Sequence, residues 1–76
     1  MRRRGDRTGW GEFHLAGTFP TALTLLVTQE MNRRNIRNRL VEVSDHATEL
    51  HVPGPHRAEA SEVLEDIKRR HRRRRL

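Results

Sequence analysis

The sequence predicts a small two-layer α+β domain of order βαββα, in which two helices cover one face of a three-stranded antiparallel sheet. Two observations predict this fold class. Three segments alternate apolar and polar residues with a period of two, and two longer segments repeat apolar residues at helical spacing. The 76-residue chain contains no cysteine, which excludes disulfides and thiolate metal sites. A chain this short buries a thin core, so we expect a homodimer or a partner protein to stabilise it.

The first strand is predicted from Gly11 to Gly17, where Phe13 and Leu15 alternate with their neighbours between two glycines. A helix is predicted from about Pro20 to Arg34, with Thr18 as its N-cap. The face of this helix that is expected to enter the core carries Leu23, Leu26, Val27 and Met31.

Two further strands are predicted at residues 40–44 and 48–52, joined by a polar turn. The second helix starts near Pro55 or His56 and has acids in its first half and arginines at its end, which complements the helix dipole. We expect Glu65 to pair with Arg69, and Asp66 with Arg70, one turn apart. The basic tail is expected to begin as an extension of this helix. The predicted core comprises Phe13, Leu15, Leu23, Leu26, Val27, Met31, Val41, Val43, Leu50, Val52, Val63, Leu64 and Ile67.

The formal net charge of +6 is divided unevenly along the chain. Residues 1–7 carry +3 and residues 68–76 carry +7, whereas residues 8–67 carry −4. We therefore divide the chain into a basic N-terminal arm (1–9), one α+β domain (10–70) and an arginine-rich tail (71–76). Basic runs of this kind attract the phosphate backbone of RNA or DNA. The alternative is a solubility tail or a nuclear localisation signal, because both have the same composition.

Four arginines in the first helix-to-strand connection could also hold phosphate, or could instead balance nearby acids. Trp10, Phe13 and Phe19 are the only aromatic residues, and Phe13 is expected in the core. This leaves few rings for base stacking, so contacts to backbone and shape are expected, with low sequence specificity. The candidate nucleic-acid-binding residues are Arg2, Arg3, Arg4, Arg7, Arg33, Arg34, Arg37, Arg39, Lys68, Arg69, Arg70, Arg72, Arg73, Arg74 and Arg75.

No motif in the sequence predicts catalysis, a metal or a cofactor. Ser44, Asp45 and His46 are consecutive and cannot adopt triad geometry with one another. His46, His51 and His56 recur every five residues, but His51 is expected to face away from the core beside Glu49, so the three are not expected to converge on zinc. We therefore expect a protein that is not an enzyme.

Phe19-Pro20-Thr21, between the first strand and the first helix, resembles the small dimerising subunit of the KEOPS tRNA-modifying complex over about residues 11–70. Arg57 stands near an arginine that opens the last helix of that family. The chain departs from the family in Glu59, in Ala60 and in its arginine-rich tail. Its closing strand-strand-helix also resembles a KH domain, without the Gly-x-x-Gly loop. The resemblance implies a dimeric scaffold that contacts tRNA indirectly or through its arms.

Two functions remain open from the sequence. The first is a small non-enzymatic protein that binds RNA, in preference to DNA, through arginine-rich arms. The alternative is a dimerising scaffold subunit of a protein or ribonucleoprotein complex such as a tRNA-modifying assembly. The longest apolar run is Leu25-Leu26-Val27, so no membrane partner is expected. An intracellular, cytoplasmic location is expected, or a nuclear one in a eukaryote.

Overall fold

The computed structural model describes residues 12–74, and its fold confirms the predicted α+β class. Strands β1 (Phe13–Pro20), β2 (Arg39–Glu42) and β3 (Ala47–Pro53) form one antiparallel sheet in the order β1-β3-β2. The last strand in the sequence is therefore the central one. Its buried residues alternate regularly along its length, as a central strand with one covered face requires.

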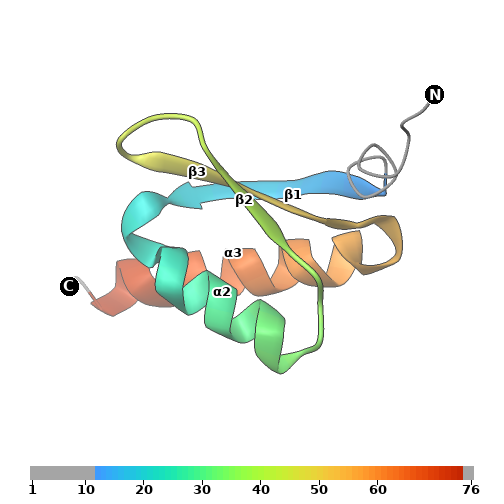
Figure 1. Ribbon diagram of the computed structural model, residues 1–76. Helices are drawn as coiled ribbons and strands as arrows, with labels where there is room; N and C mark the ends of the chain where they lie inside the picture. The colour runs from blue at the N-terminus through green and yellow to red at the C-terminus, as the bar shows by residue number, and fades with distance from the viewer. Residues whose placement is uncertain (1–11, 75–76) are drawn as a thin grey trace.

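Two helices cover one face of this sheet (Figure 1). Helix α2 (Thr24–Arg33) follows a short 3₁₀ turn, η1 (Thr21–Leu23), and helix α3 (Arg57–Arg74) follows η2 (Gly54–His56). Within residues 12–74 no helix covers the opposite face, which we call the open face. No helix of that part of the chain combines the length and the apolar character needed to cross a bilayer.

Strand β1 contains a bulge that reverses the orientation of its side chains. Its register against β3 shifts between Leu15 and Gly17, so Ala16 is an extra residue on the β1 side. Phe13 and Leu15 consequently lie on the open face, whereas Phe19 is 1% exposed in the core. The prediction that Phe13 and Leu15 belong to the core is wrong, because simple alternation does not anticipate the bulge.

Strand β1 is also longer than predicted. Thr18 pairs with Glu49 and Pro20 with Ala47, so the segment expected to open a helix remains extended. Thr18 is therefore not an N-cap. The helical turn starts only at Thr21, whose side-chain Oγ1 lies 2.8 Å from the buried Thr48 Oγ1 on β3.

The core lies between the sheet and the two helices. Leu26 and Val43, both predicted as core residues, are 52% and 53% exposed, and Val41 is half-buried on the open face. Ile36, which the hydrophobic pattern did not indicate as a core residue, is buried just after α2. The buried apolar residues are Phe19, Leu23, Val27, Met31, Ile36, Leu50, Val52, Ala60, Val63 and Leu64, with Ile67 packed against them.

The two edges of the sheet differ in protection. On β1, the Leu15 carbonyl accepts a hydrogen bond from Arg57 Nε at 3.2 Å, and the Thr18 carbonyl accepts one from Lys68 Nζ at 2.9 Å. Both donors belong to α3 and occupy acceptors that an added strand would use. The other edge is β2, which is only four residues long.

Candidate nucleic-acid interface

The connection from α2 to β2 has a defined shape that separates its arginines. Asn35 adopts a left-handed conformation with φ of 62°. Its N–H donates to the Asn32 carbonyl at 3.0 Å, and the N–H of Ile36 donates to the Met31 carbonyl at 2.9 Å. These two bonds form a Schellman motif, and burial of Ile36 anchors the turn. The chain therefore reverses between Arg34 and the arginines at the start of β2.

Arg33 and Arg34, before the turn, are paired with acids. Arg33 Nη2 lies 2.7 Å from Glu30 Oε2, and Arg34 Nε lies 2.8 Å from the same oxygen. Arg34 Nη1 also reaches Glu59 Oε2 on α3 at 2.9 Å. These two arginines behave as the charge-balancing hypothesis predicts, and Arg34 links α2 to α3.

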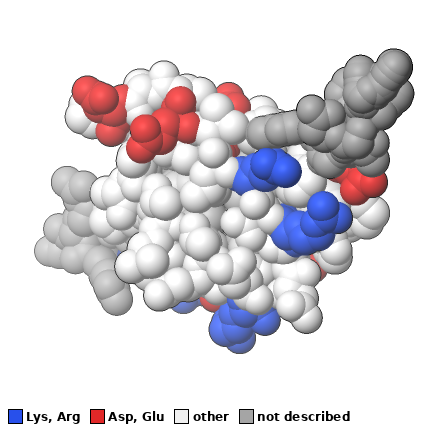
Figure 2. All heavy atoms as spheres, in the orientation of Figure 1, with Lys and Arg blue, Asp and Glu red and all other residues white. Residues whose placement is uncertain are grey.

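Arg37 and Arg39, after the turn, lie beside the open face. Their guanidinium carbons are 5.4 Å and 5.1 Å from the centroid of the Phe13 ring. These distances are within the range of cation–π attraction. Arg37 also has a 3.8 Å ion pair with Glu12, in which both side chains are more than half exposed. Figure 2 shows Lys and Arg atoms gathered where the chain enters β2, and Asp and Glu atoms gathered over the β2–β3 turn.

The aromatic residues are placed differently from the prediction. Phe13 is half-buried on the open face rather than in the core, and Phe19 fills the core instead. Trp10 lies outside the described residues. A ring next to two guanidinium groups is thus part of the surface, which the sequence did not indicate because the bulge at Ala16 has no distinct sequence signal.

The basic end of α3 begins with residues that are already paired. Lys68 Nζ lies 2.9 Å from Glu65 Oε2, and Arg69 Nη2 lies 3.2 Å from Asp66 Oδ1. Arg70 also binds Asp66, which confirms that predicted pair. The predicted ion pair of Glu65 with Arg69 is wrong, because Glu65 is bound by Lys68 three residues on and Arg69 turns to Asp66.

These contacts shift the ionisation of the acids. Hydrogen bonds from Arg33 and then Arg34 lower the pKa of Glu30, and a hydrogen bond from Arg70 lowers the pKa of Asp66. The hydrogen bond from Lys68 likewise lowers the pKa of Glu65. All three acids are therefore charged at neutral pH and neutralise the cations around them.

The remaining cations of the candidate interface belong to the two ends of the chain. Arg72 is exposed on α3, and α3 continues to Arg74, so the basic run does extend the helix as expected. Strand β1 starts at one end of the molecule and α3 finishes at the other (Figure 1). Arg2, Arg3, Arg4, Arg7, Arg75 and the side chains of Arg73 and Arg74 lie outside the described part of the chain.

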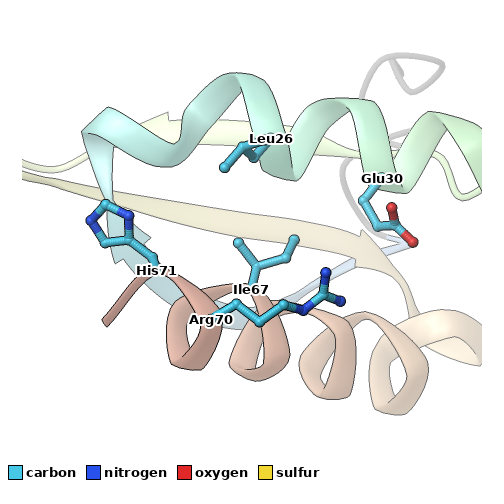
Figure 3. Close-up of a pocket in the computed structure, with 5 residues that line it drawn as sticks. All are labelled: Leu26, Glu30, Ile67, Arg70 and His71. Carbon is cyan, nitrogen blue, oxygen red and sulfur yellow. The ribbon is translucent and has the colours of Figure 1, made fainter. Parts of the chain in front are cut away.

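A small cleft separates α2 from α3 near the basic end. Its volume is about 200 Å³, and Leu26 and Glu30 of α2 face Ile67, Arg70 and His71 of α3 across it (Figure 3). Its charged groups are one acid and one arginine, so it has no excess of positive charge. Exposure of Leu26 in this cleft explains why it is absent from the core.

Two of the polar residues considered for catalysis or metal binding, Ser44 and His51, make hydrogen bonds within the fold. Ser44 Oγ accepts hydrogen bonds from the backbone N–H groups of His46 and Ala47, both at 3.1 Å, and so shapes the β2–β3 turn. His51 Nε2 lies 3.0 Å from Glu49 Oε1, on the face away from the core as expected. Among residues 12–74, no three His, Asp or Glu side chains gather in a way that could hold a metal ion.

Comparison with known proteins adds no relative: no family model, curated protein or solved structure matches this chain.

Proposed function

We propose that this chain is a non-enzymatic nucleic-acid-binding protein that holds RNA, in preference to DNA, through its arginine-rich segments. The observation that carries the proposal is the surplus of cations that remains at the end of α3 after Glu65 and Asp66 are paired. Lys68, Arg69 and Arg70 already bind Glu65 and Asp66. Four more arginines follow at positions 72–75, and no Asp or Glu comes after Asp66 in the sequence.

That surplus is concentrated on one helix end, which suits a phosphate backbone. Each arginine placed at a phosphate releases condensed counterions, and this release supplies much of the binding free energy at low salt. Arginine-rich segments commonly become ordered when they bind RNA. The helical start of this run, up to Arg74, supports such a mode.

The test is a salt series that compares the full chain with a variant in which Arg72, Arg73, Arg74 and Arg75 are all replaced by glutamine. We expect the slope of log affinity against log salt to fall by roughly 3 units on an RNA duplex, at about 0.7–0.9 per lost phosphate contact. The matched control replaces the same four residues by lysine, which keeps the charge and should keep the slope. Equal slopes for the glutamine variant and the unaltered chain would contradict the role of the tail.

The open face favours one second candidate, a dimerising scaffold subunit of a larger assembly such as a tRNA-modifying complex. Leu15 is 44% exposed on that face, and the short edge strand β2 is not capped by α3 as β1 is. A second copy or a partner protein could cover both. Sedimentation over a range of concentrations distinguishes the two candidates: a stable dimer that ignores RNA at physiological salt favours the scaffold, and a monomer retained by RNA favours the binding protein.

A further inference from the structure

A shallow hollow on the surface lies where β1, α2 and the start of β2 meet. It is lined by Phe13, Asn32, Arg37, Asn38 and Arg39 and has a volume of about 460 Å³. We refer to it as the Phe13 hollow. Its volume falls in the range of small-ligand sites, roughly 300–1,000 Å³.

The Phe13 hollow differs in charge from a second polar depression, which lies between α2 and α3. That depression is lined by four carboxylates and three arginines, which are largely paired with one another. Among the residues that the structure describes, the lining of the Phe13 hollow contains two arginines and no acid. Arg37 of this lining also pairs with Glu12 at 3.8 Å. This difference in charge favours an anion at the Phe13 hollow over the depression between α2 and α3.

The walls of the Phe13 hollow are held in place by hydrogen bonds. Asn38 Nδ2 donates to Asn32 Oδ1 at 3.1 Å and to the Ile36 carbonyl at 2.9 Å. The Schellman motif at Asn35 also fixes the backbone of the connection between α2 and β2. A site whose groups are already ordered loses less conformational entropy when a ligand binds.

The amide groups in these walls retain hydrogen-bonding capacity. The two contacts of Asn38 use its amide nitrogen, and within residues 12–74 its Oδ1 and the Nδ2 of Asn32 make no hydrogen bond. They offer one acceptor and one donor. A pair of this kind matches the edge of a nucleobase, which presents donors and acceptors side by side.

We propose that the Phe13 hollow binds one nucleotide of single-stranded RNA. Arg37 and Arg39 hold the phosphate through charge-assisted hydrogen bonds, and the planar guanidinium groups next to the Phe13 ring give the base a surface on which to stack. Asn32 and Asn38 contact the edge of the base. A base within a duplex is stacked between its neighbours and does not reach this hollow, so the site selects unpaired RNA. This inference rests on the proposed function and adds a second, more specific contact to that of the tail.

The experiment measures the affinity of the full chain for a short single-stranded RNA and for an RNA duplex by fluorescence anisotropy. The test variant is R37Q/R39Q, and the matched control is R33Q/R34Q, which removes the same charge from the other side of the turn. We expect R37Q/R39Q to weaken single-strand binding by about tenfold or more, and R33Q/R34Q by less than about threefold. All four arginines are exposed, so circular dichroism should show both variants folded.

A second measurement separates stacking from charge. R37K/R39K keeps two cations but loses the planar groups, and we expect it to lose about fivefold in single-strand affinity with an unchanged salt slope. In NMR spectra, the side-chain amide signals of Asn32 and Asn38 should move when single-stranded RNA is added.

Two outcomes would overturn the inference: equal losses for R37Q/R39Q and R33Q/R34Q, or amide signals that stay fixed at saturation. The tail variant makes this failure distinct from failure of the proposed function. If replacement of Arg72–Arg75 lowers the salt slope while the Phe13 hollow variants behave like their control, the chain binds RNA without this site. If the unaltered chain binds no RNA, the proposed function itself is wrong.

Discussion

At the scale of single residues, the bulge at Ala16 decides what each face of β1 presents. It places Phe13 on the open face beside Arg37 and Arg39, and it directs Gly17 toward the core, next to Leu64. Without the extra residue, Phe13 and the core residue Phe19 would lie on the same face of the sheet, since they are an even number of positions apart. The character of the candidate site therefore depends on one backbone irregularity.

The packing of Gly17 gives a prediction at this scale. A Cβ atom at position 17 would lie 2.8 Å from Leu64 Cδ2, and Leu64 is fully buried, so its methyl group has little room to move. The control is Gly54→Ala, whose Cβ would meet the exposed His14 ring at 3.3 Å. Both substitutions restrict the unfolded chain equally. We expect the free energy of unfolding in urea to be lower for Gly17→Ala than for Gly54→Ala by about 1–3 kcal/mol. Equal free energies would mean that Leu64 moves to accommodate the added methyl group.

At the scale of secondary-structure elements, the end of α2 organises the arginine-rich connection. Helix periodicity predicted this helix to within a few residues, and the asparagines after it correctly indicated a helix end. Sequence periodicity did not show where the side chain of each arginine lies. Arg33 and Arg34 are adjacent to Glu30 on the helix surface, whereas Arg37 and Arg39 lie beyond a left-handed residue that turns the chain toward β1.

Asn35 provides a test of this turn. A left-handed backbone conformation costs about 1–2 kcal/mol for a residue that carries a Cβ atom. The cost is smaller for asparagine, and glycine adopts this conformation freely. We expect Asn35→Ala to lower the free energy of unfolding by about 1 kcal/mol and Asn35→Gly to leave it unchanged or raise it. Thermal or urea unfolding of the three proteins measures this. Equal destabilisation by alanine and glycine would show that the asparagine side chain, not the backbone conformation, is what the turn requires.

At the scale of the whole molecule, charge pairing connects the two helices and leaves excess positive charge at the chain ends. Arg34 joins Glu30 of α2 to Glu59 of α3. The arginines at positions 72–75 follow Asp66, the last acid of the sequence, which itself pairs with Arg69 and Arg70. The same pairing makes stability depend on pH.

The lowered pKa values of Glu30, Glu65 and Asp66 give the sign of that dependence. An acid whose pKa is lower in the folded state stabilises the fold above its unfolded pKa, and this contribution is lost as the pH falls through the folded value. We expect Glu30→Gln to be slightly less stable than the unaltered chain at pH 7. The difference should shrink as the pH falls below about 4.5, the ordinary pKa of glutamate.

Urea midpoints measured for both proteins from pH 7 down to pH 2 test this expectation. The control is Glu62→Gln, an exposed acid of α3 that makes no ion pair among the residues that the structure describes. A difference between Glu30→Gln and the unaltered chain that stayed constant with pH would show that the Glu30 ion pairs do not contribute to acid stability.

The sequence by itself determined the order of the elements, most of the helix faces that enter the core, and the division of charge between an acidic domain and basic ends. These features arise from local periodicity and composition, which a chain carries before it folds. The tertiary structure decided that Phe13 faces outward, that Ile36 is buried, and that Arg37 and Arg39 share a surface with that ring. Those outcomes depend on the register of β1 against β3 and on residues more than 20 positions apart, and no local pattern encodes such contacts.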